Sequence, residues 1–445
     1  MIFSKEESGK IIESIISFSK ADSVVVNVSG ENSTNLRFAL NTVSTCGAAD
    51  SLNISITSNF GKKSGSMSLT SFELSDLEKA VRKSEEIALN SPYNEEFMPP
   101  PGIQANYSEV KEFFEETDKI SPSEISDKIT YTIKKAEDKK LVSAGFFEKS
   151  SGFISNGNSN GLISYHKNTS VKFSSTMRTD DSTGSGKIDR MYADINLLDI
   201  KKFSDKVAER AIISRNPVKF DPGKYVTILD NAAVCDMLDN LLGYLGKRSA
   251  DEGRSYFSDK TKGTKIGEKV ADEKVDIFSD PQFSDAPSTP FTSEGIPLVR
   301  TDWIKDGVLK NLFSGRYWAE KTNSRYIPYP SNIIMKGSNK SVEDLIASTE
   351  KGIYVSRFWY IRAVDPRQIL LTGLTRDGVF LIENGKIKSA INNFRFNESP
   401  LNILNNILDL SVSEKVVGSE TGDSKIVAPA VKLSEFNFSS VSDAI

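Results

Sequence analysis

Hydrophobic and polar residues alternate with two different periods along the chain. Ser4 and Glu7 make a capping box, and the isoleucines between residues 11 and 16 form one apolar stripe, which predicts an N-terminal helix. After it, short apolar runs such as 24–28 and 52–56 are separated by Gly, Asn and Ser, a texture typical of strands joined by turns. The first segment is therefore predicted to combine helix and sheet.

Helical and strand patterns continue to about residue 216, with one interruption. Ser75 and Glu78 form a second capping box and predict a helix through residue 89. The other predicted elements are helices at 108–116, 122–139 and 204–214 and strands at 141–147 and 161–176. The prolines at 99–101 stop regular structure, and a second break with Pro and Gly follows at 216–223. These breaks predict three domains, at 1–98, 103–216 and 222–445.

The last segment has the pattern of an antiparallel sheet. A strand at 225–229 precedes a helix with apolar residues between 233 and 242. The dipeptides Asp-Gly at 306–307 and Asn-Gly at 384–385 stand between apolar runs and favour the positive φ angles of a type I′ hairpin turn. A final strand is predicted at 426–431. We therefore expect an α+β protein, with N-terminal and middle α/β segments followed by a mostly antiparallel β-sheet or barrel-like C-terminal domain.

Charge and composition narrow the classes of function. The 445 residues include 56 basic and 60 acidic side chains, whereas nucleic-acid-binding proteins usually have a basic excess, so we expect no nucleic-acid partner. No stretch approaches the ~18 apolar residues of a membrane span, and the first residues lack the pattern of an export signal. We expect a cytoplasmic protein with no membrane partner, in which Cys46 and Cys235 stay reduced.

The single histidine restricts catalytic chemistry. Zinc hydrolases usually draw on two or three imidazoles, and a Ser-His-Asp centre needs one that is correctly placed. Only His166 is present, and its alternating surroundings predict a partly exposed strand position. Cys235 could act as a nucleophile or, with Asp236 and Asp239, imitate a metal site. A helix cysteine that faces the core is the simpler interpretation.

Four motifs in a fixed order connect the C-terminal third to a known family. They are SEGIP at 293–297, the hairpin TDWIKDGVLK at 301–310, LIASTEKGIY at 345–354 and LIENGKI at 381–387. This order resembles the C-terminal domain of the TldD/PmbA family, and the layout of the first two segments fits the family's other domains. The resemblance implies a dimeric protein that takes part in proteolytic processing of peptides.

The resemblance also locates a zinc motif that this chain has lost. In the catalytic branch of the family, a helix after the first C-terminal strand carries HExxxH, and a later cysteine completes the metal shell. Aligned to that helix, Leu238 and Gly243 stand at the histidine positions and Asp239 at the glutamate, and Cys235 is the last cysteine. Leucine and glycine offer zinc no donor. The departure resembles the PmbA (TldE) branch and implies that this chain binds no zinc, which a TldD-like partner would supply.

A second candidate site combines aromatic and charged residues. Its members are Trp359, Tyr360, Arg362, Asp365, Arg367, Arg376 and Asp377. In one interpretation, Arg–carboxylate pairs brace a loop. In the other, the cluster lines a groove for peptide backbone or a terminal carboxylate, with the turn at 326–330 beside it.

Three hypotheses for function follow. The first is a non-catalytic, TldE-type subunit that binds an extended peptide beside a TldD-like partner. The second is a self-sufficient hydrolase that uses Asp236 or Asp239 with a metal such as Mg²⁺, Ca²⁺ or Mn²⁺, the ions that carboxylate-only sites prefer. The third is a homodimer that binds peptides without cleaving them.

Overall fold

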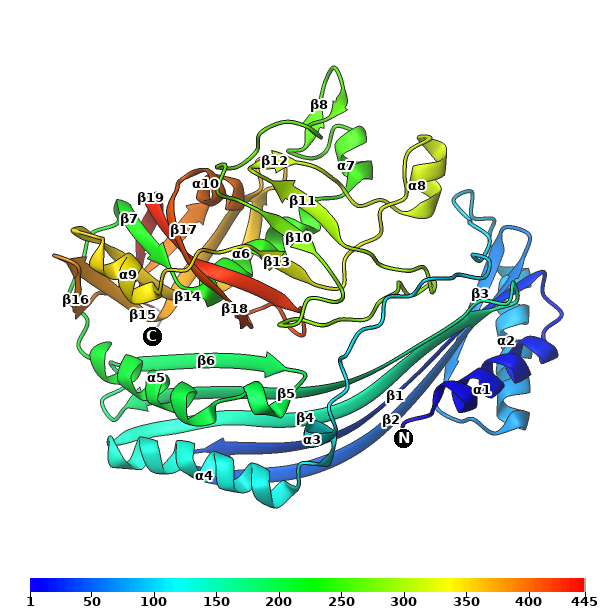
Figure 1. The fold of residues 1–445 in the computed structure, drawn as a ribbon, viewed down its shortest axis with the longest axis horizontal. Helices are drawn as coiled ribbons and strands as arrows, with labels where there is room; N and C mark the ends of the chain where they lie inside the picture. The colour runs from blue at the N-terminus through cyan, green and yellow to red at the C-terminus, as the bar shows by residue number, and fades with distance from the viewer. Residues whose placement is uncertain (444–445) are drawn as a thin grey trace.

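Two large β-sheets organise the computed structural model, which describes residues 1–443 (Figure 1). The first is an antiparallel sheet whose strands follow the order β3-β2-β1-β4-β5-β6. Its strands are β1 (Ser23–Ala39), β2 (Thr42–Phe60), β3 (Lys63–Leu69), β4 (Leu141–Asn158), β5 (Ile163–Thr179) and β6 (Ser185–Tyr192). Four of the six have 17 to 19 residues, so the sheet is long enough to carry separate cores at its two ends.

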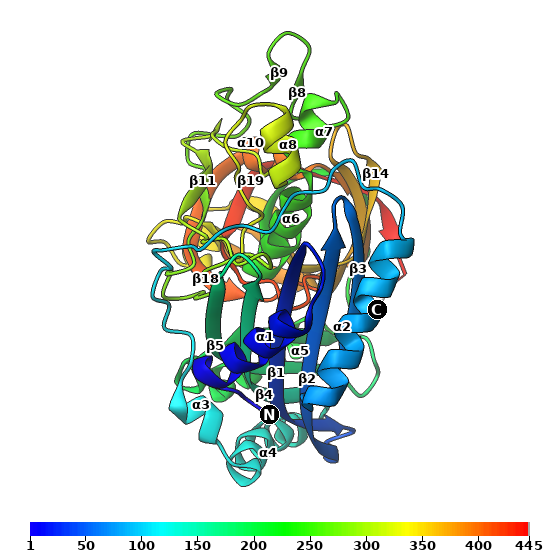
Figure 2. The same cartoon turned by 90° about the vertical axis from the view of Figure 1, so that its right-hand side faces the viewer.

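Helices cover opposite ends of this sheet. At one end α1 (Lys5–Phe18) and α2 (Leu74–Asn90) share a core with Val26 and Ile56 (Figure 2). At the other end α4 (Pro122–Asp138) and α5 (Ile200–Ile213) pack against Phe147 and Phe173. A 3₁₀ turn, η1 (Ile195–Leu197), precedes α5. Each helix hides one apolar stripe against the strands.

The local cap predictions have two outcomes. The capping box of Ser4 and Glu7 is confirmed at the start of α1. The cap at Ser75 was wrong, because α2 begins at Leu74 after Glu73, whose side chain caps nothing within residues 1–443. Instead, Ser71 donates to Asp76 in the first turn, 2.9 Å away.

One sheet joins the first two predicted domains. Strand β1 pairs with β4 from Val25↔Asn158 to Ala39↔Ala144, across the proline-rich segment. The division at 98–103 stays a prediction, and it falls within a single hydrogen-bonded sheet. The helix predicted at 108–116 was wrong, because the backbone there bonds to β5: Thr169 donates to Glu112 O, and Phe114 donates to Thr169 Oγ1. In this part of the chain the helical residues are those of α3 (Glu115–Lys119), which overlaps only the end of the predicted helix.

The second sheet contains the barrel-like C-terminal domain that the sequence predicts. Strands β7, β19, β17, β15 and β14 each pair with the next, and β14 pairs with β7, which closes a ring. Only the β7–β14 and β13–β19 pairings in this sheet of residues 1–443 are parallel. The strands are β7 (Gly223–Leu229), β10 (Ile277–Ser279), β11 (Thr301–Lys305), β12 (Val308–Leu309), β13 (Ile333–Met335), β14 (Lys351–Asp365), β15 (Leu370–Glu383), β16 (Lys386–Ala390), β17 (Asn393–Glu398), β18 (Ile407–Val416) and β19 (Ile426–Ser442).

Helix α6 (Asn231–Tyr244) follows β7 and is packed against the barrel strands. Its apolar residues join one core with Phe358, Phe396 and Phe436. The remaining small elements are α7 (Lys247–Asp251), β8 (Ser258–Asp259), β9 (Gly263–Thr264), α8 (Arg316–Lys321), α9 (Val342–Ala347) and α10 (Pro400–Asn405). The two predicted hairpin turns are confirmed, with positive φ at 306–307 and 384–385. No helix within residues 1–443 combines the length and apolar character that crossing a bilayer requires.

Candidate functional site

Helix α6, which the resemblance aligns with the zinc motif, packs in the core of the C-terminal domain and begins at a buried ion pair with α5. Asp230 caps the first turn of α6 by accepting from Asn231 N, 2.9 Å away. Arg210 of α5 donates to the Asp230 carboxylate and to Tyr354 Oη, the latter at 2.8 Å. Burial alone would raise the pKa of Asp230, but Arg210 and Lys206 outweigh it and hold that pKa well below its usual value. The start of α6 is therefore fixed by buried charges from helix α5.

The residues at the zinc positions do not fit the metal. Leu238 is 3% exposed and belongs to the barrel core, and Gly243 is exposed without a side chain. Cys235 is fully buried with Sγ 3.9 Å from Val416 O, and burial raises the pKa of its thiol well above the ordinary value. Asp239 is half-buried on the same helix. Within residues 1–443, no three His, Cys, Asp or Glu side chains converge as a metal site would require.

Asp236 binds a loop at 417–424 instead of a metal. Its Oδ1 accepts the Ser419 N–H at 2.7 Å, and a Cβ at Gly418 would lie 2.3 Å from the same oxygen, so only glycine fits there. Asp236 Oδ2 is buried and has no hydrogen-bond partner among residues 1–443. Burial raises the pKa of Asp236 to about 7, although the loop N–H groups oppose the shift. The carboxyl is therefore close to half protonated at neutral pH.

The same loop reaches the arginine cluster. Arg357 Nη1 donates to Ser419 Oγ at 2.8 Å, and that hydroxyl donates to Phe358 O. Arg362 Nη1 lies 3.0 Å from a Glu420 carboxylate oxygen. The loop thus joins two groups that the sequence placed separately, the motif helix and the aromatic–arginine cluster. Sequence reasoning missed it because the loop consists of small and polar residues that match no motif.

Part of the cluster is structural. Asp377 is buried and accepts from Arg357 Nε at 2.7 Å, and its other partner is Ser185 of β6. Burial would raise the pKa of Asp377, but the Arg357 guanidinium and Ser185 reverse this and lower it. The bracing pair is therefore Arg357–Asp377.

The rest of the cluster is more open. The guanidinium carbons of Arg357 and Arg376 each lie 5.3 Å from the Trp359 ring centre, and that of Arg362 lies 4.1 Å from the ring centre of Tyr360. Tyr360 is 54% exposed. Arg367 and Asp365 lie in the turn between β14 and β15, where Asp365 accepts from Arg367 N at 2.8 Å rather than from Arg362.

The turn at 326–330 lines a different groove. Its neighbours there are residues 296–302, and the groove has a volume of about 490 Å³. Strand β11 and the segment before it form the opposite wall. The sequence suggested that this turn lies beside the arginine cluster, a placement that stays a prediction.

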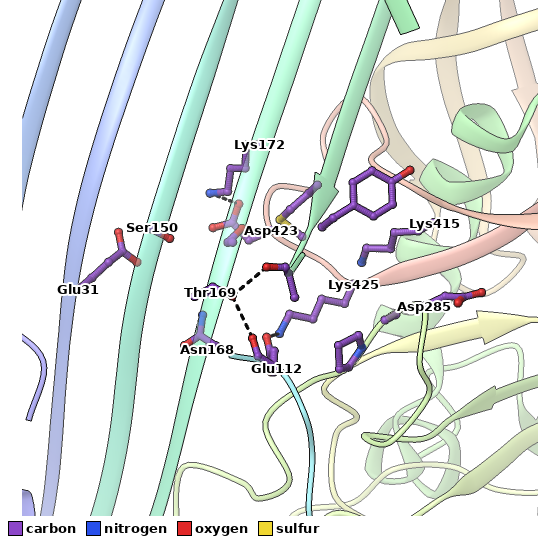
Figure 3. A pocket seen from close by; sticks show the side chains of 16 residues that line it. Glu31, Glu112, Ser150, Asn168, Thr169, Lys172, Asp285, Lys415, Asp423 and Lys425 are labelled. Carbon is purple, nitrogen blue, oxygen red and sulfur yellow. Dashed lines mark hydrogen bonds and ion pairs between the residues drawn. The ribbon is translucent and has the colours of Figure 1, made fainter. Parts of the chain in front are cut away.

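A charged cavity lies where the long sheet meets the C-terminal domain (Figure 3). His166 of β5 borders this region, and the prediction of a partly exposed histidine was wrong, since it is 6% exposed. The segment before α3 covers it, and His166 Nε2 lies 2.8 Å from Glu112 Oε2. The other oxygen of Glu112 pairs with Lys425. Glu112 and His166 lie 54 positions apart in the sequence, so sequence analysis could not identify this pair.

Comparisons with known proteins agree with this architecture. The family model of the PmbA/TldA metallopeptidase C-terminal domain matches residues 222–440. Metalloprotease PmbA of Escherichia coli O157:H7 is 23% identical over 297 residues, which are 64% of this chain and 62% of that protein. A metalloprotease of Archaeoglobus fulgidus is 26% identical over 157 residues, 32% of this chain and 36% of its own length. Both matches span less than two thirds of the relatives' length.

The fold of the whole chain also has a solved counterpart. The crystal structure of TldE from Thermococcus kodakarensis superposes with a TM-score of 0.86 and covers 97% of this chain and 99% of its own, at 18% sequence identity. At that identity the likeness establishes the fold, whereas the family model and the PmbA relative connect the sequences. From its motifs, its fold and these matches, the chain belongs to the TldD/PmbA family of metallopeptidase-like proteins.

Proposed function

We propose that this chain is a TldE-type, peptide-binding subunit that does not itself cleave, and that a TldD-like partner supplies the zinc. One observation carries the proposal: the two positions of the zinc-binding imidazoles hold the buried Leu238 and the bare backbone of Gly243. Neither can donate an electron pair from a side chain. The TldE fold of the Thermococcus protein supports the choice of branch.

A self-sufficient hydrolase is less well supported. That hypothesis needs Asp236 or Asp239 as a metal ligand, and a metal requires an ionised, reachable carboxylate. Asp236 is buried, its Oδ1 already accepts from the loop, and its pKa of about 7 keeps it partly protonated. Burial also raises the pKa of Asp239.

The open part of the arginine cluster is the proposed peptide surface. Tyr360 and Arg362 are exposed at the rim, while Trp359 is held between Arg357 and Arg376. Exposed aromatic rings give a peptide apolar contact area, and arginine forks bind its carbonyl and carboxylate oxygens. The bond from Arg362 to Glu420 connects this surface to the loop that Asp236 fixes.

A strand edge supports assembly with a partner. Within residues 1–443, positions 42–51 of β2 are all exposed and pair only with β1, because β3 pairs with residues 54–60. Unpaired backbone groups along such an edge accept a strand from another chain. We assign this edge to the partner subunit; a second copy of this chain, as in the homodimer hypothesis, is the alternative occupant.

Metal analysis and reconstitution test the proposal together. The chain purified alone should retain well below one equivalent of zinc and cleave no peptide. Mixed with an HExxxH-bearing relative from the same cell, it should elute as a heterodimer that contains zinc and cleaves peptide faster than the relative alone. About one equivalent of zinc, Mg²⁺, Ca²⁺ or Mn²⁺ held by this chain, lost on Asp236→Asn or Asp239→Asn, would overturn the proposal in favour of the hydrolase. A stable homodimer that ignores the relative would favour the third hypothesis.

A further inference from the structure

The cavity between the long sheet and the C-terminal domain has an unusual set of polar groups. Its volume is about 120 Å³, room for several water molecules. Strands β4 and β5 contribute one wall, and β18 and the loop after it contribute the other (Figure 3). Because the two walls belong to different sheets, the cavity is part of the junction between them.

Two polar groups in this cavity lack partners. Lys415 of β18 is 6% exposed, and its Nζ has no hydrogen-bond partner among residues 1–443. In Figure 3 its side chain extends from the C-terminal domain toward the long sheet. Ser170 of β5 lines the same cavity, and its hydroxyl is also buried without a partner among those residues. Buried polar groups are almost always satisfied by protein, ligand or ordered water, so two orphans in one cavity mark a place where a polar ligand would find partners.

The neighbouring charges define what kind of ligand fits. Glu112 is shared by Lys425 and His166, and Lys172 pairs with Asp423 at 2.7 Å. Glu31 lies on β1, on the opposite side of the cavity from Lys415 (Figure 3), and Asp285 is exposed. At the inner end, the two lysines 415 and 425 therefore face the single carboxylate of Glu112. That end has a surplus of positive charge when Lys415 is protonated.

We infer that this cavity binds a carboxylate group of the peptide ligand, with Lys415 as its cation and Ser170 as a neutral donor. The inference rests on the proposed function, since it assumes a peptide in the junction. An incoming carboxylate satisfies both orphaned groups and provides the counter-charge that Lys415 lacks. The carboxylate comes either from the C-terminus of the peptide or from an Asp or Glu side chain.

Binding at this cavity is coupled to proton uptake. Burial, with a smaller contribution from Lys425, lowers the pKa of Lys415 to about 7, whereas Cys235 of α6 and Glu112 act in the opposite direction. A bound carboxylate stabilises the ammonium form, so binding recruits a proton when the free lysine is neutral. Affinity should be greatest below pH 7 and fall as the pH rises above it.

A small blocked amino acid tests the cavity without a full peptide. N-acetylglycine carries the carboxylate, and N-acetylglycinamide is its neutral counterpart; both are titrated by ligand-observed NMR at millimolar concentration. The wild-type chain should bind the acid at least about tenfold more tightly than the amide. Lys415→Met should remove this preference and Ser170→Ala should reduce it, whereas Lys386→Met, an exposed control on β16, should keep it. Equal binding of acid and amide, or an undiminished preference in Lys415→Met, would overturn the inference and leave ordered water as the occupant.

A comparison of several peptides identifies which carboxylate binds and separates this inference from the proposed function. Peptides with a free or amidated C-terminus, and with Glu or Gln side chains, are compared on the wild type and on Lys415→Met. Loss of binding on amidation assigns the C-terminus, and loss on Glu→Gln assigns the side chain. Peptides that bind with no dependence on either carboxylate or on Lys415 refute the inference while the proposed function stands. If no peptide binds at all, the proposed function fails, and the inference about a peptide ligand fails with it. Lys415→Met removes a buried amine without a partner, so an unchanged or higher melting temperature confirms that the variant folds.

Discussion

Asp236→Asn should make the protein more stable at alkaline pH and change its stability little at acidic pH. In the folded chain this carboxyl is buried, only Oδ1 is hydrogen-bonded within residues 1–443, and its pKa is raised to about 7. In the unfolded chain the pKa returns to about 3.8. The folded state therefore holds the proton more tightly. The stability that this proton binding contributes is complete below pH 4 and is lost as the pH rises toward 7.

The size of the effect follows from the shift. A pKa shift of about three units, at 1.36 kcal/mol each, lowers the unfolding free energy of the wild type by about 4 kcal/mol between pH 4 and pH 8. Asparagine is neutral at every pH and keeps an oxygen for the Ser419 N–H, but its amide N–H₂ takes the place of the unpartnered Oδ2. That donor replaces the O–H of the protonated carboxyl, which has no partner within residues 1–443 either, so it changes the stability little at acidic pH and does not contribute to the pH dependence.

Urea unfolding followed by tryptophan fluorescence measures the difference. The gap in unfolding free energy between Asp236→Asn and the wild type should grow by roughly 3–4 kcal/mol from pH 4.5 to pH 8. Asp127→Asn, at an exposed position on α4, is the control for simple loss of a negative charge and should give a flat profile. A gap for Asp236→Asn that does not vary with pH would refute the reasoning, because it would mean that the carboxyl ionises as readily in the fold as in water.

Three further predictions concern the cluster and the thiols. Arg362→Ala and Arg376→Ala should weaken peptide binding about ten- to a hundredfold in fluorescence anisotropy, with the melting temperature nearly unchanged; unchanged affinity with a sharply lower melting temperature would remove support for a peptide surface. Asp377→Ala should lower the unfolding free energy by ~3–5 kcal/mol in denaturant titrations, because it leaves the buried Arg357 guanidinium uncompensated; a loss under ~1 kcal/mol would contradict the bracing role. Cys46 is exposed and Cys235 buried, so a thiol reagent should titrate one cysteine in the native chain and two after denaturation, and Cys46→Ser should leave none reactive before unfolding; a fast second native thiol would contradict the burial of Cys235.

Local signals in the sequence predicted local structure well. The Ser4–Glu7 box and the Asp-Gly turn at 306–307 depend on contacts between residues at most three positions apart, and both occur as expected. Helix α6 was also predicted, because its apolar spacing is set by the core that it faces. The long strands were only partly predicted. Residues 29–35 of β1 are mostly polar, since the sheet there borders solvent and the cavity, so the alternation that marks a strand disappears.

The sequence identified residues of the candidate site but not which of them lie together in the fold. The resemblance aligns Leu238 and Gly243, whose side chains offer no donor, with the histidines of the zinc motif, and this alignment stays a prediction. The contacts that organise the site join residues far apart in the sequence: Asp236 lies 183 residues before Ser419, and Glu112 lies 313 residues before Lys425. No periodicity encodes such pairs. Lys415 likewise has no sequence signal for burial, yet it is 6% exposed at the end of β18.

The exposed edge of β2 should limit how much of this chain a cell can make before the chain self-associates. Edge strands in monomeric proteins usually carry lysine, proline or a bulge that discourages unwanted pairing. Residues 42–51 contain no lysine or proline, Asp50 is their one charge, and the bulge in this stretch, opposite Arg37 and Phe38, leaves residues 45–51 in regular register. A chain synthesised in excess over whatever covers this edge should therefore self-associate, and its soluble yield should depend on the ratio in which the two polypeptides are made. Because of this exposed edge, we expect the chain to stay soluble only when the two polypeptides are expressed in balanced amounts.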